Sequence, residues 1–392
     1  MGFNNESTIE VELDKSVVSF DAGHPGQMTL SVLGKQLLET QPISFGPIDE
    51  TAAYHKIFRK HNFQFVNGFS VDTETIIPMG AEPKISRTMD IVGNHIKVVT
   101  DILTRGKFPA QKMSIDDIDF KGEWTRFGVI TYPTEGSTLP EIVWTDITDS
   151  NKILYQSNVP FLVMLLESVD GHVVEIGTGD DLWRWSVADT LENTNSQFTV
   201  ENNQGQVSLK RDVLIFDEER AMHTQTWRFK WYISWEMKAE RNDKIKIPAD
   251  SILLEIPGSK VAAADADLPA FSVPVTGWTK EASACMNGVV TEHQCAQTKT
   301  VRNYYNNWFR PIQKRYPETK IALANMEPHI CDSGAHVSRK DKGTAMHWDM
   351  INIFDFWLWA NKQAGKNDGR FVILPPEGSV AAQLPSMRGL SR

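Results

Sequence analysis

Polar and apolar residues alternate along the chain up to about Met237, as in Thr8–Leu13 and Ile96–Ile102. A period of two is typical of strands with one buried face. Asp170 and Gly171 stand between two apolar runs, and this dipeptide favours a tight hairpin because its residues accept positive φ. The pattern predicts a large antiparallel β-domain with too many strands for one flat sheet, folded as two stacked sheets.

The most regular strand is predicted over Trp227–Glu236, where every second residue is bulky and apolar. We expect that side of the strand to face the core. The opposite side carries Lys230 and Tyr232 among other polar residues. It lies either in solvent or on the floor of a cleft that binds a polyhydroxylated ligand.

The pattern changes towards the C-terminus. Small residues and prolines beyond residue 255 are typical of a connector. The spacing of apolar residues then lengthens and predicts helices over Lys299–Tyr316 and Thr344–Gln363. The second helix is apolar almost all round, which indicates that it is buried against the β-domain.

The polar exceptions of this second helix are Asp349, Asn352 and Asp355, which are three residues apart and project in nearby directions. A buried carboxylate needs a partner. We therefore expect this stripe to pair with Lys or Arg from the sheet or to face a polar cavity.

The fold class that follows is mainly β, with a large antiparallel two-sheet supersandwich and a smaller α-containing C-terminal segment. We expect the β-sandwich domain over residues 1–255 and the connector over 256–276. The α-containing segment, packed on the sandwich, is expected over 277–392.

The composition narrows the class of partner. The 392 residues include 50 acidic and 40 basic ones, for a net charge of −10, without any Lys/Arg-rich block. This balance argues against nucleic acids and anionic membranes, and no apolar run is long enough to span a bilayer. We expect a soluble protein of undetermined oligomeric state. Met1–Glu6 lack the features of a signal peptide, so a secreted or periplasmic location would require a leader that precedes this sequence.

Several familiar catalytic templates are absent. The sequence has no Gly-x-Gly-x-x-Gly fingerprint, Walker loop, Gly-x-Ser-x-Gly elbow, His-Glu-x-x-His or paired Cys-x-x-Cys. Nucleotide, flavin and common hydrolase functions therefore lose support. Cys285 and Cys295 enclose a short loop, and they form a disulfide in an oxidising compartment or stay as free thiols.

Three of the ten histidines fall in Asn325–Asp349, between an apolar run and the second predicted helix. A loop held by rigid elements is a usual place for catalytic groups, and a carboxylate beside an imidazole tunes its proton exchange. The competing interpretation is that these polar groups cap the helix and bind loop backbone. We predict the catalytic residues to be His329, His336, Arg339, His347 and Asp349.

The same stretch supplies groups that suit a divalent metal, with His329, Asp332 and His336 as the possible ligands. Their spacing matches no established zinc template, so the metal is a secondary hypothesis. No other cofactor is predicted.

Substrate-binding residues are predicted beyond the hairpin and on the long strand. Charged groups bind hydroxyls while flat Trp faces stack on sugar rings, so their mixture is typical of a saccharide subsite. The alternative is a turn in which Asp binds backbone and Trp fills the core. The predicted residues are Asp180, Asp181, Trp183, Arg184, Lys230 and Tyr232.

The Trp-rich antiparallel strands, with the segment Asp21–Val32 near their start, resemble the galactose-mutarotase-like β-supersandwich of carbohydrate-active enzymes. The resemblance covers roughly the first 250 residues, a length that one such domain can reach. It is one of architecture, because no catalytic motif of that family is matched. It implies a saccharide as the class of substrate and assigns no residue.

Together these features predict a carbohydrate-active enzyme that cleaves a glycosidic bond in a poly- or oligosaccharide, by hydrolysis or β-elimination. The site is expected where the C-terminal loop meets the polar face of the sheet. His336 or His347 would act as acid or base, Asp349 would orient an imidazole, and Arg339 would neutralise developing charge. Two alternatives stay open: a non-catalytic carbohydrate-binding protein, and a sugar epimerase or mutarotase-like isomerase.

Overall fold

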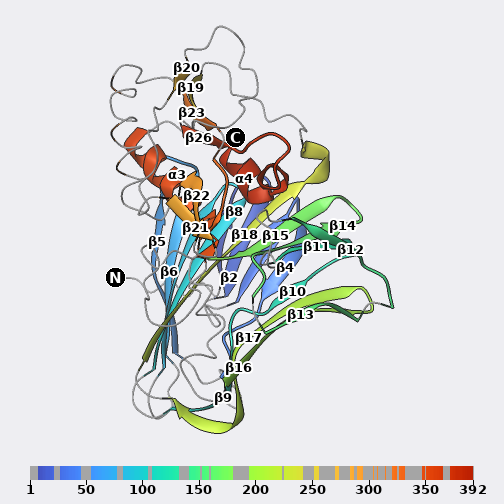
Figure 1. Cartoon of the computed structure of the whole chain (residues 1–392). Helices are drawn as coiled ribbons and strands as arrows, with labels where there is room; N and C mark the ends of the chain where they lie inside the picture. The colour runs from blue at the N-terminus through green and yellow to red at the C-terminus, as the bar shows by residue number, and fades with distance from the viewer. Residues whose placement is uncertain are drawn as a thin grey trace.

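Two antiparallel sheets of nine strands each form most of the protein in the computed structural model (Figure 1). The predicted mainly β class with two large antiparallel sheets is therefore confirmed. The structure describes residues 8–21, 27–45, 54–76, 83–104, 108–131, 141–150, 152–158, 160–179, 194–222, 225–241, 251–255, 270–272, 283–286, 289–294, 303, 307, 314, 320–324, 326–331, 347–348, 350–364 and 371–391.

The first of these, sheet A, runs in the order β1-β2-β3-β4-β10-β17-β16-β13, and β9 also pairs with β17. Its strands are β1 (Thr8–Glu12), β2 (Ser16–Asp21), β3 (Met28–Val32), β4 (Lys35–Thr40), β9 (Phe108–Ser114), β10 (Ile118–Phe120), β13 (Ile153–Ser157), β16 (Thr194–Asn203) and β17 (Gln206–Met222).

The second, sheet B, runs in the order β12-β11-β14-β15-β18-β8-β7-β6-β5. Its strands are β5 (Tyr54–Asn62), β6 (Gly68–Ile76), β7 (Lys84–Val92), β8 (His95–Thr104), β11 (Trp124–Ile130), β12 (Val143–Asp146), β14 (Val163–Ser168), β15 (His172–Thr178) and β18 (Gln225–Met237).

The apolar faces of sheets A and B pack against each other and form the larger hydrophobic core. On β18 every second residue from Trp227 to Trp235 is at most 4% exposed, as the period of two predicts. The predicted hairpin is also confirmed, because β14 pairs with β15 and Gly171 between them has a φ of +84°. Local sequence signals therefore determine the strands that build this core.

A buried ionic network joins the two sheets inside the sandwich. Asp116, which is 1% exposed, pairs with Arg87 of β7 and accepts a hydrogen bond of 2.8 Å from Trp231 Nε1 of β18. Arg211 of β17 lies 4.2 Å from the centre of the Trp231 ring and donates to the main-chain oxygen of Asp116. Because an unpaired buried charge is strongly unfavourable, this network fixes how sheet A sits on sheet B.

Asp116→Asn should lower the free energy of unfolding by about 3 kcal/mol, because it keeps the side-chain shape but leaves the buried guanidinium group of Arg87 without its carboxylate. Urea denaturation measures the change. The matched control is Asp101→Asn. Asp101 pairs with Arg228 at the surface, where the side chains are 33% and 51% exposed. Its loss should change stability by less than about 1 kcal/mol, and equal effects of both substitutions would contradict this assignment.

The C-terminal part contains a small parallel sheet, sheet C, in the order β20-β19-β23-β26. The sequence analysis did not predict it. The remaining elements are β19 (Ser251–Glu255), β20 (Ala270–Ser272), β21 (Ser283–Met286), β22 (Val289–Gln294), β23 (Lys320–Ala324), β24 (Ile330–Cys331), β25 (His347–Trp348), α3 (Met350–Ala364), β26 (Phe371–Leu374), α4 (Pro385–Leu390) and the 3-10 turns η3 (Lys238–Glu240) and η4 (Ala381–Gln383).

The C-terminal part differs from the prediction in its element boundaries. The helix predicted over Thr344–Gln363 exists as α3 but starts later, because the residues before it pair as β25 with β24. The strand β19 and the strand β20 lie in the ranges expected for the sandwich and the connector, yet both pair within sheet C. The helix predicted over Lys299–Tyr316 lies largely outside the described residues.

Sheet B is covered on its second face as well. Figure 1 shows α3 and α4 between sheet C and the sandwich, and their apolar residues form a second hydrophobic core with residues from sheet B. On β18, Tyr232, Ser234 and Glu236 are at most 4% exposed. From Tyr232 to Glu236 this side of β18 does not lie in solvent, because the C-terminal segment packs on it, whereas Arg228 near the start of the strand is exposed.

Candidate functional site

Glu175 on β15 lies at the contact between sheet B and the C-terminal segment. Its Oε1 accepts hydrogen bonds from the Tyr232 hydroxyl (2.7 Å) and the Ser386 hydroxyl (2.8 Å), and its Oε2 accepts one from the Ser386 backbone N–H (2.8 Å). Trp348 Nε1 donates in turn to the Tyr232 hydroxyl over 3.3 Å. One buried carboxyl group thus connects sheet B with β25 and α4.

Tyr232, predicted to bind substrate, is the middle member of the hydrogen-bonded chain Glu175–Tyr232–Trp348, which we call the relay. Its side chain is 0% exposed, and its ring packs where a side chain of Gly177 would lie, 2.1 Å from the Cβ that such a side chain would have. The hydroxyl contacts Glu175 and Trp348. In this arrangement the buried side chain of Tyr232 holds β25 against sheet B through Trp348.

The Glu175 carboxyl group has an unusual acidity. Burial raises its pKa to about 7, while the hydrogen bonds from Ser386 and Tyr232 act in the opposite direction. The nearby Glu236 carboxylate adds to the upward shift. The contact between sheet B and α4 therefore contains a group that titrates near neutral pH.

The stability of the protein should fall as the pH rises because of Glu175. Its folded-state pKa of about 7 lies above the reference value of 4.5, so its contribution is present below pH 4.5 and is lost between pH 4.5 and 7. The loss amounts to roughly 3 kcal/mol. Glu175→Gln should flatten this dependence, because an amide does not titrate yet can accept from the Ser386 N–H and donate to its hydroxyl.

Urea unfolding at pH 5 and pH 7.5 measures this slope. The control is Glu12→Gln at an exposed position of β1, which should leave the slope of the wild type. The same slope in Glu175→Gln as in the wild type would show that another group causes the dependence.

The predicted saccharide-binding segment begins beside the end of the predicted catalytic loop. Gly179 donates its N–H to the carbonyl oxygen of Lys230 over 2.8 Å. A Cβ on Gly179 would lie 2.5 Å from Lys230 Cβ and 2.9 Å from Ile351 Cδ1 of α3, so only glycine fits. Asp180 follows Gly179, and Asp349 precedes Ile351 by two residues. The described residues next to the two segments, Gly179 and Ile351, therefore lie together on the outer face of sheet B.

The structure also brings two of the predicted histidines into one ribbon. His329 is half-buried and directly precedes β24. β24 pairs with β25 in antiparallel register, with Cys331 opposite His347. The other predicted residues lie outside the described part of the chain, and their roles stay predictions: Asp180, Asp181, Trp183, Arg184, Asp332, His336, Arg339 and Asp349.

Glu327 stands at the carboxyl edge of sheet C, just beyond β23. Ligands of open parallel sheets bind at this edge. Burial raises the pKa of Glu327, and a hydrogen bond with Ser379, which follows β26, partly offsets that shift. A carboxyl group that stays protonated closer to neutral pH suits a general acid.

Sequence reasoning did not include Glu327 among the catalytic residues. It lies inside the stretch Asn325–Asp349 that was singled out, directly after the apolar run that forms β23. The signal that would have identified it is the parallel pairing of β23 with β19 and β26. That pairing joins residues far apart in sequence, so local pattern does not reveal it.

The predicted metal ligands are only partly within the described residues. Among the side chains that the structure describes, no three His, Cys, Asp or Glu residues gather closely enough to hold a metal ion. Asp332 and His336 fall outside that part, so the metal hypothesis at His329 stays a prediction.

None of the helices that the structure describes is long and apolar enough to cross a membrane.

A cavity of about 440 Å³ lies away from this site, where the β1–β2 and β7–β8 turns meet α3 and α4. His95 on its wall is 1% exposed and packs between Tyr232 and Phe354, with ring centres 5.2 Å and 4.0 Å away. Burial and the charge of Lys97 lower the pKa of His95 to about 3. The imidazole is therefore neutral at physiological pH, and we assign it a packing role.

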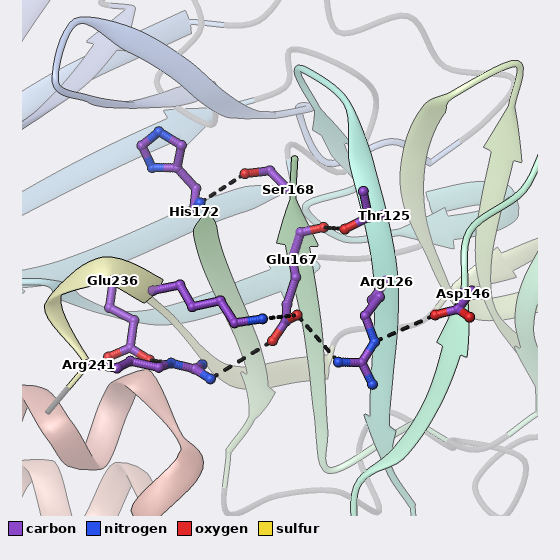
Figure 2. A network of polar contacts seen from close by, with 9 residues as sticks. Thr125, Arg126, Asp146, Glu167, Ser168, His172, Glu236 and Arg241 are labelled. Atoms are coloured by element: carbon purple, nitrogen blue, oxygen red, sulfur yellow. Dashed lines mark hydrogen bonds and ion pairs between the residues drawn. The ribbon is translucent and has the colours of Figure 1, made fainter. Parts of the chain in front are cut away.

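Figure 2 shows a network of charges elsewhere on sheet B. Glu167 is 5% exposed and pairs with Lys238 (3.2 Å), Arg126 (3.6 Å) and Arg241 (3.9 Å). Arg241 also pairs with Glu236 over 2.6 Å. Because both buried carboxylates have basic partners, this network stabilises the end of β18 and the turn that follows it.

Comparison with known proteins yields structural neighbours. No protein-family profile and no curated protein sequence matches the chain. The fold is similar to a galactose mutarotase related enzyme from Lactobacillus acidophilus, with 6% identity, a TM-score of 0.39 and coverage of 60% of this chain and 99% of that one. It is similar to a galactose mutarotase-like protein from Lactobacillus casei, with 9% identity, a TM-score of 0.38 and coverage of 58% and 100%.

A further neighbour is a GH36 α-galactosidase from Geobacillus stearothermophilus, with 9% identity, a TM-score of 0.41 and coverage of 98% of this chain and 77% of that one. The neighbours thus include the mutarotase-like group that the sequence resembles. At these identities and TM-scores we transfer neither residue roles nor activity from them.

Gly179→Ala should disturb the site directly. The new Cβ would lie 2.7 Å from the Lys230 carbonyl oxygen, a backbone atom that moves only if β18 shifts. We expect a loss of about 1–3 kcal/mol in the free energy of unfolding, together with weaker saccharide binding. Urea denaturation and calorimetric titration measure the two effects.

The control is Gly205→Ala in the β16–β17 turn. Gly205 has a φ of +88° and open space around it, so alanine there introduces only backbone strain of about 1 kcal/mol. Binding should then be unchanged. Wild-type binding and stability in Gly179→Ala would contradict the close packing described for Gly179.

Proposed function

We propose that this protein is a carbohydrate-active enzyme that cleaves a glycosidic bond in a poly- or oligosaccharide. The observation that carries the proposal is the meeting of the two predicted site segments where Gly179, Lys230 and Ile351 pack together. One segment leads into the predicted saccharide subsite, and the other contains the predicted acids, bases and Arg339.

Glu327 is connected to sheet B through the β24–β25 pair and the relay of Glu175, Tyr232 and Trp348. It precedes β24, where Ile330 is the register partner of Trp348. Trp348 donates to the hydroxyl of Tyr232, which lies two residues from Lys230 on β18. Glu327 thus lies three residues before the β24–β25 pair that Tyr232 holds on sheet B, and its raised pKa supports an acid role for it.

The class of substrate is proposed from the residues of the subsite. Asp180, Asp181 and Arg184 offer hydrogen-bonding groups for hydroxyls, and Trp183 offers a flat apolar face. The half-buried Lys230 lies where this segment begins. Such a mixture favours a sugar ring over an apolar or a strongly charged ligand.

In the proposed reaction Glu327 donates a proton to the glycosidic oxygen as its bond to the sugar breaks. For hydrolysis a second carboxylate, for which Asp349 is our candidate, removes a proton from water while the water oxygen bonds to the anomeric carbon. For β-elimination His336 or His347 removes the proton next to a uronic-acid carboxylate, and Arg339 neutralises the charge that develops.

Glu327→Gln should reduce turnover by about 100-fold or more, because the amide cannot donate the proton that the leaving oxygen needs. A screen of polysaccharides for reducing ends and for the ultraviolet absorbance of unsaturated uronates measures product. Wild-type activity should also fall as the pH rises above the pKa of Glu327, since the acid must be protonated. Glu377→Gln, at an exposed position beyond β26, is the matched control and should keep wild-type activity.

The outcomes separate the proposal from its alternatives. Full turnover in Glu327→Gln would remove Glu327 as the acid. Saccharide binding by the wild type without any product would favour the non-catalytic carbohydrate-binding protein. A change in sugar configuration without cleavage would favour the epimerase or mutarotase-like isomerase.

A further inference from the structure

A cleft of about 580 Å³ lies between α3 and the strands β5, β7 and β8 of sheet B. We name it the α3 cleft. Its size falls in the range of small-molecule sites, roughly 300–1,000 Å³. The residues that matter for its chemistry are His61, Phe63, Phe65, Lys97, Trp359 and Lys362.

Three half-buried aromatic side chains line the cleft beside its polar residues: Phe63, Phe65 and Trp359. Phe63 and Phe65 lie with ring centres 5.4 Å apart, and His61 meets Phe63 edge-on at 5.8 Å. Trp359 stacks on Phe356 at 5.8 Å, which holds its ring in place. Fixed aromatic faces beside hydrogen-bonding groups suit a sugar ring, which has both C–H faces and hydroxyls.

The charges of the α3 cleft cancel. Lys97 is 8% exposed, and its ammonium group contacts Asp355 of α3 over 2.5 Å and Asp90 of β7 over 2.7 Å. Burial alone would lower the pKa of Lys97, and the two carboxylates outweigh it and raise the pKa. With the exposed Lys362, two cations face two anions in the lining of the cleft. A ligand without net charge therefore fits the cleft best.

The α3 cleft is separate from the proposed cleavage position. Ile351, which contacts Gly179, and Trp359 are eight residues apart on α3. At 1.5 Å per residue this corresponds to about 12 Å along the helix. One extended polymer can therefore contact both places, whereas a single sugar ring cannot.

We propose that the α3 cleft is a second binding site that holds a neutral saccharide chain beside the cleavage position. This inference rests on the proposed function for its class of ligand, in its hydrolytic form, because β-elimination needs a uronic acid. Trp359 supplies the stacking face. The ammonium group of Lys97, the two carboxylates that pair with it, and Lys362 supply the hydrogen bonds to hydroxyls.

The test is affinity electrophoresis of the full chain in gels that contain neutral galactomannan or acidic polygalacturonate. The wild type should be retarded by galactomannan more than by polygalacturonate. Trp359→Ala should weaken retardation about tenfold, which corresponds to the loss of one stacking contact. Trp144→Ala is the matched control, because Trp144 is another half-buried tryptophan and lies outside the cleft on β12; it should bind as the wild type does.

A second variant keeps the test valid if Trp359→Ala folds poorly. Lys362→Ala changes an exposed side chain and should weaken galactomannan binding about threefold, the loss of one hydrogen bond. Three results would overturn the inference: no retardation of the wild type in either gel, stronger retardation by polygalacturonate, or wild-type binding in both cleft variants.

Glu327→Gln distinguishes this inference from the proposed function. It should bind galactomannan as the wild type does while losing turnover. Galactomannan binding that depends on Trp359, in a protein whose turnover is unaffected by Glu327→Gln, would support the α3 cleft and reject the proposed acid.

Discussion

The positions of β25 and α4 on the outer face of sheet B depend on the buried carboxyl group of Glu175. A carboxyl group that is fully buried needs hydrogen-bond donors from its surroundings. Tyr232 and Ser386 provide them from β18 and α4. The requirement therefore fixes α4 on the sheet, and through Trp348 it also fixes β25, the strand that leads into α3.

This constraint decides which polar residues of the sheet serve structure and which remain available. Tyr232 is buried in the relay, whereas Lys230, two residues earlier on the same face, stays half-buried beside Gly179. Gly177 and Gly179 leave space for the ring of Tyr232 and the stem of Lys230. Small residues at the end of β15 and just beyond it, with large ones on β18, thus place the start of the predicted saccharide-binding segment against α3. The geometry of the site follows from packing before any chemistry is considered.

Much of the sandwich could be predicted from the sequence, because its signals are local. The period of two on β18 and the Asp170-Gly171 turn each depend on neighbouring residues, and both are confirmed. The stripe on α3 was also informative, since Asp355 pairs with Lys97 from the sheet and lines a cleft. Here the need of a carboxylate on a largely apolar helix for a partner made the prediction possible.

The features that escaped prediction depend on contacts between distant parts of the chain. Sheet C is built from short apolar runs, such as Lys320–Ala324, that fit a strand or a helix equally well. Its parallel pairing, which gives Glu327 its position, leaves no local pattern. The outer side of β18 has the polar residues of a solvated face, and only the docking of the C-terminal segment shows that its part from Tyr232 to Glu236 is buried.

We propose that the segment following Gly179 and the loop between β23 and α3 form one saccharide site. The decisive measurement is a crystal structure of Glu327→Gln with a bound oligosaccharide substrate. We expect Trp183, His336 or His347, and the side chain at position 327 all to contact sugar rings at the cleavage position. A bound sugar that touches one of the two segments while the other lies elsewhere on the protein would contradict it.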